Sequence, residues 1–276
     1  MEVKPLNACF GATVTNVNLE GLDEHAFAEL YALWLRYALL IFPGQFLSHD
    51  VQVEFAKRFG NLEFEYAAIS NLNREGTVRG DDDVVKILKG NMEWHCDSTY
   101  MPVMAKGAVF SAHVVPEKGG ETGWADMRAA YAVLDPKTRD QVDSLSARHS
   151  LQHSQAKVGH SHSEQSQYSG YGFHDGDIPV RPLVKQHPET GIKSLLIGRH
   201  AYGLSGMASV DSEQLLARLV AEACGDDRTY FHRWSKGDVV VWDNRCLLHR
   251  VNDWDMKLPR VMYHSRIAGD PQSEGY

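Results

Sequence analysis

The sequence lacks the features that mark exported, membrane-spanning or nucleic-acid-binding proteins. No run of Lys and Arg exceeds two residues, and the net charge is -8, which disfavours nucleic acid as a partner. Apolar stretches such as 38–43 and 239–242 are far shorter than the roughly 20 residues of a membrane-spanning helix. The chain begins without an apolar signal segment. We therefore expect a cytoplasmic protein with neither a nucleic-acid nor a membrane partner.

Cysteine is scarce as well, and its placement argues against a disulfide framework. The four cysteines form no CxxC pair and lie far apart, at Cys9, Cys96, Cys224 and Cys246. A chain of this size without an export signal is expected to keep its thiols free.

The 276 residues are 43% apolar and 23% charged, as in average globular proteins. We expect one domain over residues 1–276. A homo-oligomer suits such a chain, but no sequence feature sets the number of subunits.

Strand patterns dominate the chain after about residue 85, separated by turn sequences rich in Gly and Pro. The expected strands are Phe10–Val17, Tyr37–Phe42, Val85–Leu88, Ala108–Val115, Ser194–Ile197, Val239–Trp242 and Arg260–Arg266. The expected helices are Asp23–Arg36, a helix capped by Ser48 that ends near Phe59, Met127–Leu134 and Ser212–Cys224. Short strands with inserted helices indicate an α+β, mainly β fold, namely a double-stranded β-helix (jelly roll) flanked by helices.

Residues 150–180 differ from the rest of the chain. Ser, His, Gln and Gly dominate this stretch, and it has little periodicity. Long connections without regular structure are commonly active-site lids or disordered insertions. We expect residues 150–180 to form a lid over an active site.

Three His-x-Asp or His-x-Glu triplets occur, and on a strand such a triplet presents two metal ligands on one face. The triplet at His187 contains Pro188 and lies in a predicted turn, where a strand is disfavoured. The triplet at His162 lies in the polar stretch. His95-Cys96-Asp97 stands at the start of the strand-rich half. It is therefore the best candidate for metal ligation.

A third ligand has to come from another strand. His249 follows the apolar strand 239–242, and Arg260 lies eleven residues later. A hairpin with its turn at Asn252–Pro259 would bring Arg260 back beside His249. Two histidines, one carboxylate and open positions form the facial triad of non-haem iron(II) oxygenases. An arginine nearby suits a dicarboxylate, because a guanidinium binds carboxylate in a bidentate manner.

Three ordered motifs resemble those of the taurine / 2,4-dichlorophenoxyacetate dioxygenase family. They are Trp94–Tyr100 (WHCDSTY), Gly119–Met127 (GGETGWADM), and Trp242–Arg245 (WDNR) followed by His249 and Arg260. The resemblance extends from Phe10 to Arg266, nearly the whole chain. Within the family, the chain is most similar to the aryloxyalkanoate and phenoxypropionate dioxygenases, through the segments 40–45, 55–60, 196–200 and 264–266.

The resemblance implies an enzyme that uses Fe(II), 2-oxoglutarate and O2 to hydroxylate a small anionic molecule. The implied iron ligands are His95, Asp97 and His249. The implied contacts to 2-oxoglutarate are Thr122 and Arg260 at its distal carboxylate, and Asn91 and Trp242 in the surrounding pocket.

One position departs from the family pattern. Several members carry a second arginine four residues after the co-substrate arginine, where it meets the anionic group of the substrate. This chain has His264 there. The nearest replacements are Arg199 and Arg266. Arg199 is the preferred partner for the substrate acid group, because a comparable arginine occurs in the phenoxypropionate branch.

The leading interpretation is hydroxylation of an aryloxyalkanoate beside its ether oxygen, followed by cleavage of the ether. Oxidation of an alkyl sulfonate, a sulfate ester or an amino-acid-like acid stays open, because carboxylate and sulfonate both suit a guanidinium. A non-catalytic metal-binding or sugar-binding jelly roll also stays open, although such a module has no need for a dicarboxylate clamp. Two histidines and a carboxylate would suit zinc too.

Overall fold

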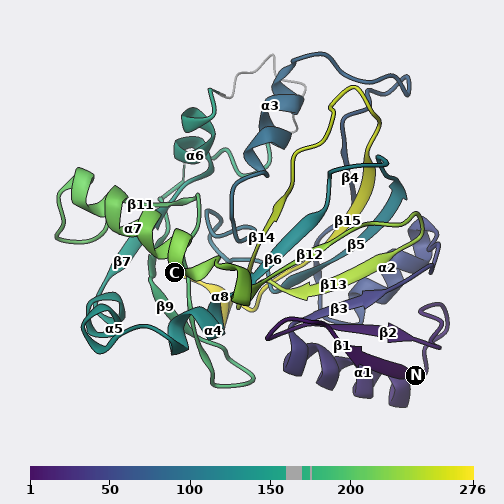
Figure 1. Ribbon diagram of the computed structural model, residues 1–276, viewed down its shortest axis with the longest axis horizontal. Helices are drawn as coiled ribbons and strands as arrows, with labels where there is room; N and C mark the ends of the chain where they lie inside the picture. The colour runs from purple at the N-terminus through teal and green to yellow at the C-terminus, as the bar shows by residue number, and fades with distance from the viewer. Residues whose placement is uncertain (160–169, 175) are drawn as a thin grey trace.

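The computed structural model describes residues 1–159, 170–174 and 176–276. Strands and helices are mixed, as the α+β prediction requires. A large sheet and a small sheet form the body of the molecule, and a lobe of helices and short strands lies beside them (Figure 1). Within these residue ranges, no helix has the length and apolar character needed to cross a membrane.

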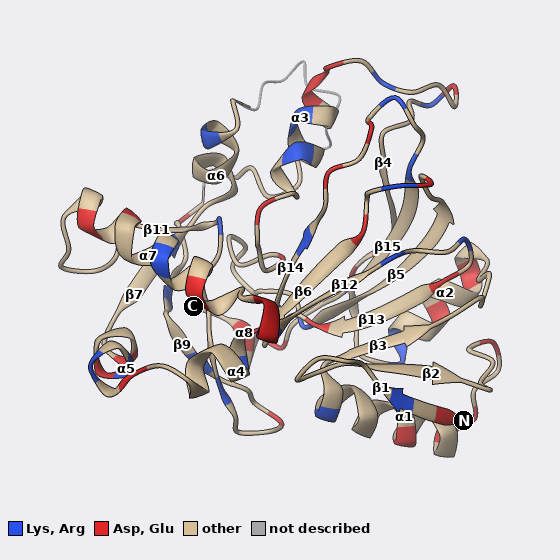
Figure 2. Ribbon diagram, viewed as in Figure 1, with Lys and Arg blue, Asp and Glu red and all other residues tan. Residues whose placement is uncertain are grey.

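The large sheet has seven strands in the order β1-β2-β3-β13-β5-β15-β4. Their bounds are β1 Glu2–Pro5, β2 Ala12–Thr15, β3 Leu39–Phe42, β4 Leu62–Ser70, β5 Gly107–Val114, β13 Val239–Asp243 and β15 Val261–Ile267. β2 and β3 run parallel, and the other neighbours are antiparallel. Lys, Arg, Asp and Glu are almost absent from the central strands β3, β5 and β13 (Figure 2), where Asp243 is the exception. Both faces of this sheet are therefore covered by other elements.

The small sheet has three strands in the order β12-β6-β14. Their bounds are β6 Thr122–Asp126, β12 Thr229–His232 and β14 Leu247–Val251. Trp124 of β6 and Trp242 of β13 are both buried, with ring centroids 6.0 Å apart. This aromatic contact joins the small sheet to one face of the large sheet.

Two helices cover the other face of the large sheet, α1 (Glu24–Tyr37) and α2 (His49–Lys57) (Figure 1). Asp23 and Ser48 cap them with side-chain oxygens, so both helices begin where the sequence predicts. Along β3, Leu40 and Phe42 pack in the core under these helices, whereas Leu39 and Ile41 pack in the core toward the small sheet. Strand alternation thus separates two cores.

The lobe is built between β6 and β12. Its helices are α4 Met127–Ala132, α5 Pro136–Asp143, α6 Leu151–Lys157 and α7 Ser209–Ala223. Its strands are β7 Ser146–His149, β8 Val180–Pro182, β9 Val184–Gln186, β10 Lys193–Leu195 and β11 Ala201–Tyr202. The 3-10 helix η1 (Asp226–Arg228) leads into β12, and α8 (Pro271–Glu274) lies near the end of the chain.

Apart from the corrections below, the predicted elements are confirmed, with ends shifted by at most three residues.

The segment Val85–Leu88, predicted as a strand, lies instead in helix α3 (Asp83–Gly90). Asp82 caps its first turn. Three apolar residues at positions i, i+3 and i+4 line a cavity, namely Val84, Ile87 and Leu88. A short apolar run fits both a strand and a buried helix face; the capping carboxylate is the signal that separates them.

The predicted hairpin between His249 and Arg260 is wrong, because β14 and β15 belong to different sheets. The connection 252–259 instead crosses from the small sheet to the large sheet.

The segment 150–180 also has more regular structure than predicted, since it contains α6 and the start of β8. Residues 160–169 and 175 lie outside the described residues, and with them the triplet at His162.

The turn between β13 and β14 is tied to the lobe by buried charges. Asp243 is fully buried and binds Arg245 Nη2 at 2.7 Å and His187 Nε2 at 3.0 Å. Arg245 Nη1 lies 2.5 Å from a carboxylate oxygen of Glu189. The triplet His187-Pro188-Glu189 therefore holds this turn, and within the described part of the chain it does not belong to a group of side chains that could hold a metal ion.

We expect Arg245→Met to lower the free energy of unfolding by about 3–5 kcal/mol, because it leaves the buried Asp243 carboxylate without its cation. Arg218→Met removes an exposed partner of Glu222 and should change this free energy by less than about 0.5 kcal/mol. Urea unfolding followed by tryptophan fluorescence measures both variants. Equal unfolding midpoints would show that the buried pair does not stabilise the fold.

Candidate active site

Three side chains from two distant segments meet between the sheets, His95, Asp97 and His249. Their ligand atoms lie within 4.8 Å of one another, and all three residues are buried. His95 and His249 exchange two backbone hydrogen bonds, of 3.0 and 2.8 Å, as an isolated β-bridge. The segment around this bridge is irregular, so the His95-Cys96-Asp97 triplet does not lie on a strand. The bridge, rather than strand alternation, therefore brings the ligands together.

The backbone of Asp97 is clamped by Asn244, which follows β13. Asn244 Oδ1 accepts from the Asp97 amide at 2.9 Å, and Nδ2 donates to the Asp97 carbonyl at 3.0 Å. Nδ2 also donates to the Ala105 carbonyl at 2.9 Å. Asn244 lies in the WDNR motif, and its role could not be predicted from the motif. A buried amide with three backbone partners holds the ligand loop in one position.

The hydrogen bonds of the ligands show which atoms face a common point. The Glu93 carbonyl lies 2.8 Å from His95 Nδ1; a carbonyl only accepts, so Nδ1 carries the proton and the Nε2 lone pair is free. His249 Nε2 lies 3.7 Å from Asp97 Oδ2. This oxygen is buried and has no hydrogen-bond partner among the described residues. Two imidazole nitrogens and an orphaned carboxylate oxygen fit a divalent metal such as Fe(II), with positions left open for other ligands.

Burial keeps both histidines in their neutral form. It lowers the pKa of His95 to about 3, and it also lowers the pKa of His249. Burial alone would raise the pKa of Asp97, but the Arg266 guanidinium, 3.0 Å away, and the neighbouring histidines hold this pKa well below its usual range. All three side chains are therefore in their metal-binding forms at neutral pH.

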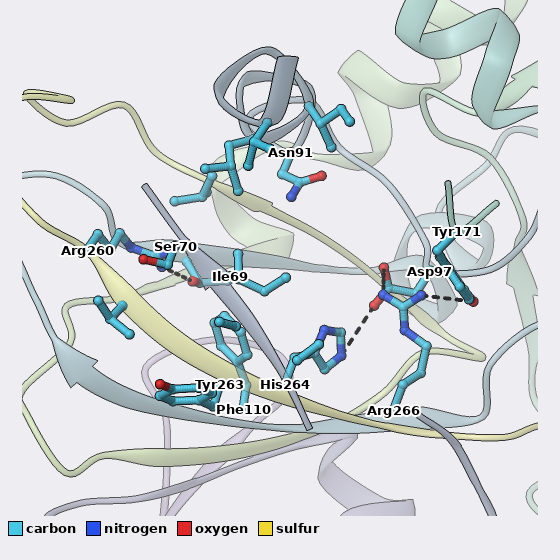
Figure 3. Close-up of a pocket in the computed structure, with 18 of the residues that line it drawn as sticks. Ile69, Ser70, Asn91, Asp97, Phe110, Tyr171, Arg260, Tyr263, His264 and Arg266 are labelled. Atoms are coloured by element: carbon cyan, nitrogen blue, oxygen red, sulfur yellow. Dashed lines mark hydrogen bonds and ion pairs between the residues drawn. The ribbon is translucent and has the colours of Figure 1, made fainter. Parts of the chain in front are cut away.

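A cavity of about 840 Å³ opens beside these ligands. Figure 3 shows Asp97, His264 and Arg266 toward one end of the cavity, Arg260 toward the other, and Asn91 at its border. Apolar and aromatic side chains supply much of the wall, among them Phe64, Ile69, Ile87, Leu88, Val261 and Tyr263. The volume suits one or two small molecules beside the metal position.

Arg260 is buried at its end of the cavity and pairs with no carboxylate in the described part of the chain. Its Nε donates to the Gly120 carbonyl at 3.2 Å, and its Nη2 lies 3.5 Å from Thr122 Oγ1. Burial lowers the pKa of Arg260 to about 10, so the guanidinium is charged at neutral pH. Trp234 Nε1 donates to Thr122 Oγ1 at 3.0 Å, which leaves the hydroxyl proton of Thr122 to be donated elsewhere. Sequence reasoning missed Trp234.

Asn91 and Trp242 also line the cavity, so the structure brings all the expected co-substrate contacts together. The Asn91 carbonyl accepts from the Val251 amide at 2.9 Å, which ties the end of α3 to β14. Trp242 Nε1 is buried without a hydrogen-bond partner among the described residues. The indole ring lies 4.9 Å from the His249 ring, measured between centroids.

The structure separates the two arginines expected at the substrate acid group. Arg266 lines the cavity, and its Nε is buried without a hydrogen-bond partner among the described residues. Arg199 is not among the lining residues. Its Nε lies 3.2 Å from Glu93, and its Nη2 donates to the Ser154 carbonyl at 2.9 Å. The position of Arg199 therefore gives no support to a substrate contact, in contrast to Arg266.

Known proteins share this arrangement of the chain. The model of the family "Taurine catabolism dioxygenase TauD, TfdA family" matches residues 2–266. The (S)-phenoxypropionate/alpha-ketoglutarate-dioxygenase of Sphingobium herbicidovorans is 58% identical over 277 residues, which cover 99% of this chain and 96% of that protein. The protein of the same name from Delftia acidovorans is 57% identical over 284 residues, covering 100% and 97%.

A solved structure agrees with these matches. The crystal structure of AAD-2 in complex with Mn(II) and N-oxalylglycine has a TM-score of 0.90 and 32% sequence identity to this chain, and the match covers 98% of both chains. The match with the family model spans all the motifs of the site, from His95 to Arg266. The chain belongs to the taurine catabolism dioxygenase TauD, TfdA family.

Proposed function

We propose that the protein is an Fe(II)- and 2-oxoglutarate-dependent dioxygenase. The observation that carries the proposal is the buried guanidinium of Arg260, which has a hydroxyl neighbour but no carboxylate partner in the described part of the chain. A buried cation without an anion is costly, so this end of the cavity suits the distal carboxylate of 2-oxoglutarate. The similar AAD-2 structure contains N-oxalylglycine, a dicarboxylate that differs from 2-oxoglutarate by an NH in place of a methylene.

The residues of the site hold and orient the reactants. His95, Asp97 and His249 would bind Fe(II) and leave its cavity side open. When bound, Fe(II) supplies the activation of O2 that couples decarboxylation of 2-oxoglutarate to oxidation of a substrate C–H bond. Arg260 and Thr122 anchor the distal carboxylate, so that the keto-acid end of 2-oxoglutarate points toward the metal ligands.

The substrate that we propose is an aryloxyalkanoate. The relatives at 57% and 58% identity are named for (S)-phenoxypropionate. The apolar and aromatic cavity wall suits an aryl ring, and Arg266, beside the metal ligands, suits the acid group. Hydroxylation of the carbon that carries the ether oxygen gives a hemiacetal-type product. This product collapses to a phenol and a carbonyl compound, which breaks the ether.

The fold and the lid belong to the same proposal. Two sheets with an aromatic core between them and a chain that crosses from β14 to β15 support a double-stranded β-helix. Leu151, Gln155 and Tyr171 line the cavity, which supports a lid role for the described part of residues 150–180. The whole chain then forms one catalytic domain.

Purified protein reconstituted with Fe(II) and ascorbate should release succinate from 2-oxoglutarate. A phenoxyalkanoate should stimulate this release and yield a phenol, whereas His249→Ala should abolish both products because it removes a metal ligand. Stimulation only by alkyl sulfonates, sulfate esters or amino acids would keep the reaction class and reject the aryloxyalkanoate. No succinate under any condition, despite bound iron, would leave a non-catalytic metal-binding protein.

We expect Arg260→Met to weaken the binding of 2-oxoglutarate without lowering the stability of the fold. We expect the KM for 2-oxoglutarate to rise at least about 30-fold, because loss of a buried charge partner costs about 2–5 kcal/mol. The urea midpoint of the protein without 2-oxoglutarate should stay the same or rise, since the variant removes an unpaired buried cation. Arg218→Met, at the surface, is the control and should leave the KM unchanged. A large loss of stability in Arg260→Met would identify Arg260 as a structural cation.

Acid should destabilise the metal-free protein. Burial lowers the pKa values of His95, His149 and His264 to about 3, whereas histidines of the unfolded chain titrate near about 6.5. Between these values the unfolded state binds more protons, so stability is complete above about pH 6.5 and is lost as the pH falls. Each histidine contributes up to about 1.4 kcal/mol per pH unit. Urea midpoints measured from neutral pH to about pH 5 test this slope, and a flat profile would contradict it.

A further inference from the structure

Arg266 of β15 is held by polar partners on two sides. Its Nη2 lies 3.0 Å from Asp97 Oδ1. Its Nη1 donates to the Ser98 hydroxyl at 3.1 Å and to the Tyr171 hydroxyl at 3.3 Å; Figure 3 shows Tyr171 and Asp97 beside this guanidinium. Glu63 of β4 accepts from both hydroxyls, from Ser98 at 2.9 Å and from Tyr171 through its other oxygen. Glu63 therefore lies at the far end of a network that begins at Asp97.

The direction of the protons in this network follows from its chemistry. Each hydroxyl has one proton, and the Glu63 carboxylate can only accept. The Ser98 and Tyr171 hydroxyls lie 2.9 Å apart, and each donates to Glu63 and accepts from Arg266 Nη1. The guanidinium donates to both hydroxyls and forms an ion pair with Asp97 at the same time. Its plane is thereby fixed relative to the carboxylate.

Ser98 adds a constraint on the backbone directly after Asp97. It is fully buried, and its φ of 57° lies in the left-handed region. A serine there is strained and persists only where its surroundings hold it. Its hydroxyl contacts with Glu63 and Arg266 supply that hold. The orientation of the neighbouring carboxylate is thus coupled to the same network.

We propose that Glu63, Ser98 and Tyr171 are positioning residues, which act through Arg266 to make Asp97 bind the metal through Oδ2 alone. Oδ1 is engaged by Arg266. Oδ2 is buried and has no hydrogen-bond partner in the described part of the chain. The inference rests on the proposed metal site, and it holds whichever acid is the substrate.

Glu63→Gln changes the network with little change in shape. An amide nitrogen in place of one carboxylate oxygen donates a hydrogen bond. One hydroxyl must then turn its proton away from residue 63, toward the other hydroxyl 2.9 Å away or toward Arg266. Either change alters the hydrogen bonds that hold the guanidinium in place. Glu65→Gln is the matched control, because it removes the same charge from the same strand at an exposed position, where Glu65 faces Lys57 at 3.4 Å.

Metal-free protein should be titrated with Co(II) in the absence of 2-oxoglutarate, and the visible absorption bands of bound Co(II) should be recorded. We expect Glu63→Gln and Tyr171→Phe to raise the Kd for Co(II) about tenfold. Both should also shift the absorption bands, because Asp97 is no longer restricted to one oxygen. Glu65→Gln should leave the Kd and the spectrum unchanged. Thermal unfolding midpoints establish that each variant is folded.

An unchanged Kd and spectrum in both Glu63→Gln and Tyr171→Phe would overturn the inference. Failure of the wild-type protein to bind Co(II) would overturn it together with the proposed function. Co(II) binding with the expected shifts, but no succinate from the iron-loaded wild-type protein, would support the positioning network and reject the dioxygenase proposal alone.

Discussion

The site depends on the amide of Asn244, which clamps the backbone of Asp97. Asn244 lies in the turn that leaves β13 of the large sheet and enters β14 of the small sheet, and β14 carries His249. This one turn thus fixes the distance between the two sheets and the position of His249. It also fixes the backbone position of Asp97, the carboxylate ligand. The buried pair of Asp243 and Arg245 ties the same turn to the lobe. Because the ligand loop is irregular, no strand ladder could replace this clamp.

β15 and the residue before it provide two cations with different tasks. Arg260, His264 and Arg266 have the same parity along the strand, so they share one face, and all line the cavity. Arg266 is paired with Asp97, whereas Arg260 forms no ion pair among the described residues, and Glu121 acts on its charge only from a longer distance. Burial lowers the pKa of His264 to about 3, so it is neutral and adds no charge between them. Partner contacts, not residue type, therefore give the two arginines different tasks. Arg260 is open to an anion, whereas Arg266 orients Asp97 and keeps its Nε, which has no hydrogen-bond partner among the described residues, for the acid group of a substrate.

Residue chemistry was easier to predict from the sequence than the path of the chain. That His95, Asp97, His249 and Arg260 lie around one cavity could be predicted, because metal ligation and dicarboxylate binding need particular residue types in order. The wrong hairpin between His249 and Arg260 arose because sequence separation does not show which sheet a strand joins. Helix α3 was predicted as a strand because the short segment Val85–Leu88, with three apolar residues and Lys86, suits both the strand period and the helix period. Contacts such as those of Asn244 depend on tertiary packing, and a lone polar residue has no pattern that predicts them.

The buried charges that line the cavity explain why an acid suits this site better than a neutral molecule. They are Asp97, Arg260 and Arg266, and the first and last neutralise each other. Under the proposed function, a divalent metal and dianionic 2-oxoglutarate also cancel, so the sum over these groups is one positive charge. Burying net charge in a cavity of low polarity is costly. A substrate with one negative charge removes this excess, whether its acid group is a carboxylate or a sulfonate. The charges of the cavity therefore favour acids over neutral molecules, and the apolar wall decides which acids fit.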